Sequence, residues 1–217
     1  GREFHNFIIS NLRGLTTEQQ EKMVNAKVFL YGGEESDEAG GHKTLSAKAK
    51  ELFDKKLVEF SDLDIIDPLY NTDANTEYWE TRLGNTKFTV THFFAWLKDN
   101  SDTFSETISD ESLNVVFWRW VKSNVTISDK LKEEIPALPI LINGNEFADS
   151  SDAIYFSDSY LEGKSLETYV KRFDENALFL SPAYITEDDN LDSWIQFWNK
   201  IGVKQEILDV IIETIIR

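Results

Sequence analysis

One pattern, which occurs twice, constrains this chain more than any other feature of its sequence. Residues 67–84 read DPLYNTDANTEYWETRLG, and residues 181–202 read SPAYITEDDNLDSWIQFWNKIG. Each stretch contains Pro, any residue, Tyr, any residue, Thr and an acid, followed by a polar turn and a short Trp-bearing segment that ends in Gly. The residue before a proline is biased towards extended geometry, so neither stretch is expected to be one continuous helix. An apolar segment with helical spacing follows each glycine.

The repetition extends upstream of these two stretches. VFLYG at residues 28–32 matches ILING at residues 140–144, and short apolar segments that we expect to be strands follow at 57–60 and 177–180. Two copies of one unit usually pack around a shared core. Chance likeness between common helix–turn units is the alternative interpretation.

The predicted fold is therefore α+β, dominated by helices, with short strands and two tandem pseudo-repeats. The first pseudo-repeat is expected at residues 1–135, including an N-terminal helix and a helical insert, and the second at residues 136–217. The two form either separate units or one compact unit. Residues 27–97 and 139–212 are expected to superpose, with Tyr70 over Tyr184 and Trp79 near Trp194.

Local signals place further elements. Thr16 with Gln19 three residues later forms a capping box that predicts a helix to about residue 25. Asn143-Gly144 is the pair typical of a type I′ hairpin turn. The remaining expectations are a strand at 28–31, a helix from Thr44 or Ser46 to 55, a polar loop at 100–110, a helix around 113–121, a strand at 153–156 and a helix from Ser165 to 174.

Composition excludes several classes of function. The formal net charge is −17, so direct binding of nucleic acid through its phosphates is not expected. The chain has no cysteine, which rules out disulfides and thiolate chemistry and suits a cytoplasmic location. No apolar run approaches the ~20 residues that a membrane-spanning helix needs, so no membrane partner is expected. Because the chain begins with Gly rather than Met and ends on an apolar segment, we expect a piece of a larger protein.

The usual catalytic and cofactor motifs do not occur. GGHKT at residues 40–44 lacks the Gly-Lys-Ser/Thr order of a phosphate loop and follows four acids. The three histidines have no ligand spacing. The acids of residues 187–192 fit the positive end of a helix better than a calcium loop, although a weak calcium site stays open. We therefore predict no catalytic, cofactor-binding or metal-binding residue.

Two candidate surfaces for protein partners remain. Trp118 lies off the apolar stripe of its predicted helix and next to Arg119, which is compatible either with a wide core face or with an interaction surface. Ile212 and Ile216 widen the apolar face of the final segment beyond the stripe that a surface helix needs. We expect the rest of the parent chain, or another protein, to cover these residues.

The run LPILINGNEFADSSDAIYFSDSYLEG, then FLSPAYI and WIQFWNKIGVK, resembles segments of large sacsin-like and NO VEIN-like proteins, including bacterial relatives. Such proteins carry a GHKL-type ATPase domain (the gyrase and histidine-kinase class) upstream of segments like this one. The match is clearest over residues 136–208 and contains no catalytic motif. The resemblance implies a scaffold or coupling module of a chaperone-like or defence-like ATPase.

The sequence thus predicts a non-catalytic structural or protein-interaction module of a larger sacsin-like ATPase. The alternative is an enzyme domain with an unrecognised active site built from carboxylates. Carboxylates with perturbed pKa values in one concave pocket would favour the enzyme.

Overall fold

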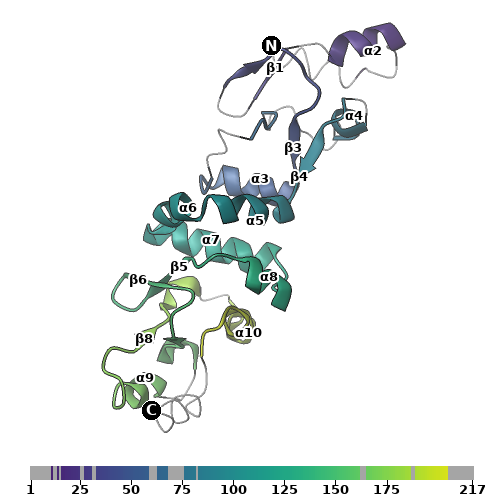
Figure 1. Cartoon of the computed structure of the whole chain (residues 1–217). Helices are drawn as coiled ribbons and strands as arrows, with labels where there is room; N and C mark the ends of the chain where they lie inside the picture. Colours follow the sequence, from purple (N-terminus) through teal and green to yellow (C-terminus); the bar gives the residue numbers. More distant parts are fainter. Residues whose placement is uncertain are drawn as a thin grey trace. The chain divides into compact units, whose positions relative to one another are not determined.

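A computed structural model shows a mixed α+β chain in which helices predominate, as predicted (Figure 1). The structure describes Asn11, Gly14 and residues 16–24, 27–30, 33–58, 63–67, 76–81, 83–161, 165–186 and 189–204. The chain divides into two compact units, Gly1–Phe93 and Phe94–Arg217. The division falls inside helix α5 (Val90–Asp99). No described helix is long and apolar enough to cross a membrane.

The first unit combines short helices with very short strands. Its helices are α2 (Thr17–Val24), α3 (Ala47–Asp54) and α4 (Thr76–Thr81), followed by the start of α5; its strands are β1 (Val28–Phe29), β2 (Glu35–Ser36), β3 (Lys43–Leu45) and β4 (Thr86–Phe88). β1 pairs antiparallel with β2, and β3 pairs parallel with β4. Residues 65 and 66 join these two pairs, because Ile66 bridges antiparallel to Leu30 and Ile65 bridges parallel to Lys43. The strand order is therefore β2, β1, residues 65–66, β3, β4.

Side-chain caps fix the starts of two helices in this unit. The Thr16 backbone N–H donates to Gln19 Oε1 at 2.8 Å, and the Gln19 N–H donates to Thr16 Oγ1 at 3.3 Å. The predicted capping box is confirmed. Ser46 caps α3 by accepting from the Ala49 N–H, which decides between the two predicted caps, Thr44 and Ser46.

The core of the first unit forms where β1 meets the Trp-bearing helix. Trp79 on α4 is 1% exposed and packs in one cluster with β1 and Ile66. The buried members of this cluster are Val28, Ala39, Ile66, Trp79 and Leu83. Burying each large side chain of this kind contributes about 1.5–3 kcal/mol.

The second unit begins with helices and ends with a mixed sheet. Its helices are α6 (Ser101–Ile108), α7 (Glu111–Asn124), α8 (Asp129–Glu134), α9 (Leu166–Val170) and α10 (Leu191–Ile201), with 3₁₀ turns η2 (Asp158–Tyr160) and η3 (Pro182–Tyr184); its strands are β5 (Pro139–Ile142), β6 (Glu146–Asp149), β7 (Ile154–Tyr155) and β8 (Leu178–Phe179). α7 packs against α6 and β5 (Figure 1), and also against η3.

The sheet of the second unit is joined by two bridges. β5 pairs antiparallel with β6, and β7 pairs parallel with β8. Leu180, directly after β8, bridges antiparallel to Ile142 of β5, and Lys204 bridges parallel to Tyr155 of β7. The strand order is therefore β6, β5, β8, β7, residue 204.

Several local predictions need correction. Residues 101–108 form α6 rather than a loop, because Phe104 and Ile108 lie one turn apart and are 2% and 0% exposed. Of the strand predicted at 57–60, Leu57 and Val58 are buried but lie in no strand, and residues 59 and 60 lie outside the described residues; the bridges of the first unit are made by residues 65 and 66. The β5–β6 hairpin forms, but positive φ occurs at Gly144 and Asn145, not at Asn143 and Gly144.

The boundary between the units also differs from the one expected at 135/136. Two side chains of α7 bind the first residue of β5: Asn114 Nδ2 and Trp118 Nε1 each donate to the Pro139 carbonyl at 2.9 Å. These bonds tie α7 to the sheet that follows it. α6, α7 and α8 therefore belong with the second unit, which begins at Phe94.

Candidate interaction site in the second unit

Trp118 and Arg119 start from adjacent positions on α7 but reach different neighbours. The Trp118 side chain is 1% exposed, and its ring lies 5.3 Å from that of Trp198 on α10. Its indole N–H donates a hydrogen bond to the Pro139 carbonyl. Trp118 therefore belongs to the core of this unit, and only its edge reaches a surface pocket.

A buried polar network surrounds the hydroxyl of Tyr184. This hydroxyl donates to Asn114 Oδ1 and accepts from the Leu141 N–H at 2.6 Å. The Asn114 amide group donates in turn to the Ile108 carbonyl at 2.8 Å and to Pro139. Burial raises the pKa of Tyr184 well above its usual value, so the hydroxyl stays protonated and acts as a donor. The network fixes α7, β5 and η3 to one another.

Tyr160 makes a similar internal contact. Its hydroxyl donates to the Ser181 carbonyl at 2.8 Å, and burial raises the pKa of this hydroxyl as well. Ser181 begins the Pro-x-Tyr turn, so Tyr160 holds the backbone at the start of that turn, while Tyr184 connects the turn to α7 and β5. Neither hydroxyl is left to react with a substrate.

Arg119 connects α7 to the segment before α10. Its Nε donates to the Tyr184 carbonyl at 3.0 Å, and its guanidinium forms an ion pair with Asp189. Desolvation favours the protonated form of Asp189, but hydrogen bonds from the Thr186 N–H and hydroxyl, together with Arg119, outweigh it and lower the pKa of this carboxyl group. Asp189 is thus held ionised by partners within its own unit, as a structural ion pair is.

Aromatic rings fill the space between α7, η3 and α10. Trp198 lies 4.8 Å from Tyr184 and 5.0 Å from Phe197, measured between ring centroids. Trp194 stacks on Trp198, and the ammonium of Lys122 lies 4.6 Å from the Trp194 ring centroid. Such contacts add about 0.5–1.5 kcal/mol each to the burial of the rings. The tryptophans of α10 are therefore core residues, as their helical spacing predicts.

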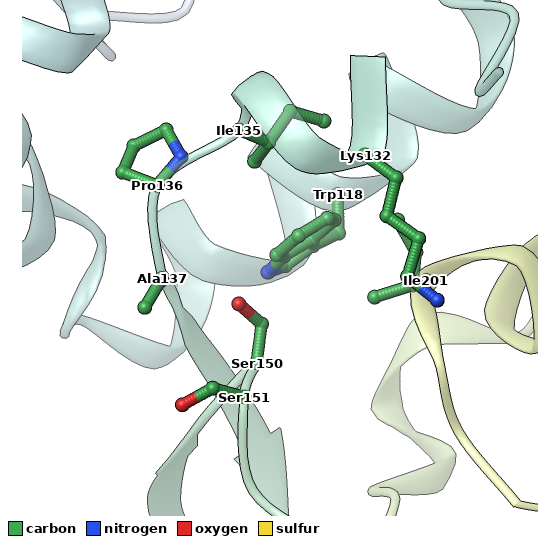
Figure 2. Close-up of a pocket in the computed structure, with 8 residues that line it drawn as sticks. All are labelled: Trp118, Lys132, Ile135, Pro136, Ala137, Ser150, Ser151 and Ile201. Carbon is green, nitrogen blue, oxygen red and sulfur yellow. The ribbon is translucent and has the colours of Figure 1, made fainter. Parts of the chain in front are cut away.

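A pocket of about 210 Å³ opens beside this core (Figure 2). Figure 2 shows the Trp118 indole in its centre, with Lys132 of α8 extending towards Ile201 at the end of α10. The lining residues come from α7, α8, the segment after α8, the turn after β6 and α10: Trp118, Lys132, Ile135, Pro136, Ala137, Ser150, Ser151 and Ile201. No acid is among them, so this pocket is not the convergence of carboxylates that would favour an enzyme.

Two polar groups of the pocket are available to a ligand. Lys132 is exposed, and no described residue forms an ion pair with it. The ammonium lies over Gly202, since a Cβ added there would be 3.6 Å from Lys132 Nζ. Ser150 Oγ accepts from the Leu138 N–H at 3.0 Å, and its own proton can be donated.

Only some of the residues that the sequence predicts for an interaction surface can be placed in the structure. The structure places Trp118 at the pocket and Arg119 in the internal ion pair, whereas Ile212 and Ile216 lie outside the described residues. Sequence reasoning missed Lys132 and Ser150, which are distant in sequence from Trp118. The only local sequence sign of a pocket was Pro136, which follows the end of α8 and lies in a short apolar stretch before β5.

Metal and phosphate sites are not supported within the described part of the chain. No group of three or more potential metal ligands occurs there. At the GGHKT loop, the His42 N–H donates to Asn85 Oδ1 at 2.7 Å and the Lys43 N–H donates to the Asp64 carbonyl at 2.9 Å. These backbone donors are already used and do not face a phosphate.

Comparisons with known proteins give no relative. No family model, curated protein or solved structure matches this chain.

Proposed function

We propose that this chain is a non-catalytic scaffold made of two copies of one structural unit, which serves as a protein-interaction module of a larger sacsin-like ATPase. The expected partners are the rest of the parent chain or other proteins. The role of the whole assembly is chaperone-like or defence-like. The two-copy architecture carries the proposal, and the sequence resemblance supplies the ATPase context.

The strongest support for two copies is a set of matched backbone hydrogen bonds. In the first unit, Ile66 N–H donates to the Lys43 carbonyl at 2.9 Å; in the second, Leu180 N–H donates to the Tyr155 carbonyl at 2.8 Å. Two further backbone bonds of the first unit have counterparts in the second. The Asp67 N–H donates to the Phe29 carbonyl, as the Ser181 N–H does to the Leu141 carbonyl. The Thr86 N–H donates to the His42 carbonyl, as the Lys204 N–H does to the Ile154 carbonyl. Within each of the three pairs, the acceptor residue of the second unit follows the acceptor residue of the first by the same number of positions along the chain. Generic helix–turn units would not share strand order, strand direction and register.

The helix ends support the same alignment. Thr16 caps α2 and Ser128 caps α8, each accepting from the backbone N–H three residues later. Thr16 and Ser128 are as far apart in sequence as the two acceptor residues of each matched strand bond. In this proposal α8 therefore corresponds to α2 and belongs to the second copy. This proposal replaces the helical insert expected before residue 136.

The Trp-bearing helices end in a similar way, with a spacing that differs by one residue. Gly84 and Gly202 both have positive φ, at 68° and 126°. The residue after each glycine donates its N–H to a tryptophan carbonyl, Asn85 to Trp79 at 3.1 Å across six residues and Val203 to Trp198 at 3.0 Å across five. We therefore pair Trp79 with Trp198 rather than with Trp194. Tyr70, the proposed counterpart of Tyr184, lies outside the described residues.

A scaffold role agrees with how the polar side chains of the second unit are used. Asn114, Tyr184 and Arg119 bind backbone carbonyls and N–H groups within the unit. Such contacts position secondary-structure elements and leave little for chemistry. Asp189, the described acid with a lowered pKa, is paired with Arg119.

The functional proposal is tested by reconstitution with the upstream part of the same reading frame. The purified chain is mixed with the GHKL-type ATPase domain that the proposal expects there, and the mass of the complex is measured by light scattering after size exclusion. We expect a stoichiometric complex, ATP turnover by the ATPase domain, and none by this chain alone. A reading frame without such a domain, or a chain that turns over ATP by itself, would overturn the proposal.

A further inference from the structure

Two residues that line the pocket beside Trp118 have buried counterparts in the first unit. This comparison rests on the proposed two-copy architecture, in which Ser151 corresponds to Ala39 and Ile201 to Leu83. Ala39 and Leu83 are 2% and 5% exposed and belong to the core cluster with Trp79. Ser151 is exposed, and it lines the pocket together with Ile201. At this pair of positions the second unit therefore has an exposed polar residue, Ser151, where the first has the buried Ala39.

The lining gives this pocket a definite chemical character. Its walls are apolar, formed by Ile135, Pro136, Ile201 and the edge of Trp118. One cation, Lys132, lies at the side of these walls, and Ser150 adds a hydroxyl donor. An occupant should therefore carry an apolar group together with one anionic group.

The size of the pocket limits what the occupant can be. A volume of about 210 Å³ is below the roughly 300–1,000 Å³ of typical small-molecule sites. It suits a single amino-acid side chain. A residue at a chain terminus also brings an anion, its carboxylate, a few bonds from that side chain.

We propose that the pocket beside Trp118 binds the carboxyl-terminal residue of a partner protein when that residue is apolar. The side chain packs against Ile135, Ile201 and Trp118. The terminal carboxylate forms an ion pair with Lys132 and accepts a hydrogen bond from the Ser150 hydroxyl. On a chain of net charge −17, acidic segments are repelled at long range, and a single carboxylate directed at Lys132 is the anion that fits.

The test measures discrimination between a free and a blocked carboxyl terminus. The probe is the acetylated tetrapeptide Gly-Gly-Gly-Leu, and the blocked probe is the same peptide with a terminal amide; binding of each to the full chain is measured by calorimetry. We expect the free peptide to bind about fivefold more tightly, as an exposed ion pair worth up to about 1 kcal/mol implies. In Lys132→Gln this ratio should fall to about one.

Lys200→Gln is the matched control, because Lys200 is an exposed lysine on α10 that does not line the pocket. It should keep the wild-type ratio. Melting temperatures confirm that both variants fold. Hexanoate, tested alongside, should bind more weakly than the peptide.

Three outcomes would overturn the inference: no binding of the free peptide at millimolar concentration, an acid-to-amide ratio unchanged in Lys132→Gln, or hexanoate binding as tightly as the peptide. The last would assign the pocket to free carboxylic acids. None of these outcomes bears on the reconstitution with the ATPase domain, so failure of the pocket and failure of the scaffold role are separable.

Discussion

The Tyr184 hydroxyl donates a hydrogen bond to Asn114 Oδ1, joining the Pro-x-Tyr turn to helix α7. The same hydroxyl accepts from the Leu141 N–H, so one oxygen atom connects three separate elements. Tyr184 and Asn114 are both 0% exposed. Water therefore cannot replace either partner.

Tyr184→Phe should lower the free energy of unfolding of the chain by about 1–3 kcal/mol, because it leaves the Leu141 N–H and Asn114 Oδ1 buried without their partner. Urea unfolding followed by circular dichroism measures the change. Tyr169→Phe removes the same atom from a half-buried ring and should cost less than about 0.5 kcal/mol. Equal effects of the two substitutions would show that the network contributes nothing to stability.

Asp189→Asn should destabilise the chain at neutral pH and lose this effect in acid. The pKa of Asp189 is lowered in the folded state, so its carboxylate stabilises the fold above the ordinary value of 3.8, and that stabilisation disappears as the pH falls through the folded-state pKa. The stability difference between wild type and variant, measured by urea unfolding, should therefore shrink below pH 3.8. Glu106→Gln, at an exposed position of α6, is the control and should show no such dependence.

Substitution of the helix-ending glycines should follow the order of their backbone angles. Gly84→Ala places a side chain at φ 68°, in the left-handed helical region, and should cost about 1–2 kcal/mol. Gly202→Ala, at φ 126°, lies in a region that is nearly restricted to glycine and should cost more. Gly14→Ala is the control, since nothing lies within 4 Å of the added Cβ and its φ is not positive. Melting temperatures that do not follow this order would contradict the described helix ends.

ATP should not bind to the GGHKT loop. The His42 and Lys43 N–H groups already donate to Asn85 and Asp64, and the loop before them is acidic. Calorimetry at millimolar ATP with magnesium should show no binding heat. Magnesium-dependent binding that is lost in Lys43→Ala would contradict this account of the loop.

The proposed two-copy architecture predicts matched contacts in solution. Nuclear Overhauser effects between backbone protons should connect Lys43 with Ile66 and, at the same register, Tyr155 with Leu180. The pairs Phe29–Asp67 and Leu141–Ser181 should behave likewise. A register that differs by even one residue between the two units would argue for chance likeness, because one residue exchanges the two faces of a strand.

Local chemistry made part of this fold predictable from the sequence. Thr16 and Ser46 cap helices because a hydroxyl oxygen satisfies a backbone N–H three residues later, and this depends only on neighbouring residues. The β5–β6 hairpin was signalled in the same way by its Gly-containing turn. Helix α6 was not, because only Phe104 and Ile108 interrupt a polar segment and their partners lie on other helices.

The parallel pairings and the pocket depend on non-local contacts. β3 and β4 have three residues each, too few for a clear alternation, and their pairing is set by residues far apart in sequence. Similarly, Lys132 and Ser150 reach one pocket from α8 and from the turn after β6. Sequence spacing could not indicate that these two residues line the same pocket.

Every strand pairing in the described chain connects two positions on the same side of α5, either within residues 28–88 or within residues 139–204. During synthesis on the ribosome, the last strand of the first sheet therefore emerges well before β5 has been translated. No pairing of the first sheet has to wait for the second, which shortens the time for which its unpaired edges are exposed to aggregation. Two nearly identical strand orders on one chain invite exchange between copies, and this temporal separation during translation works against it.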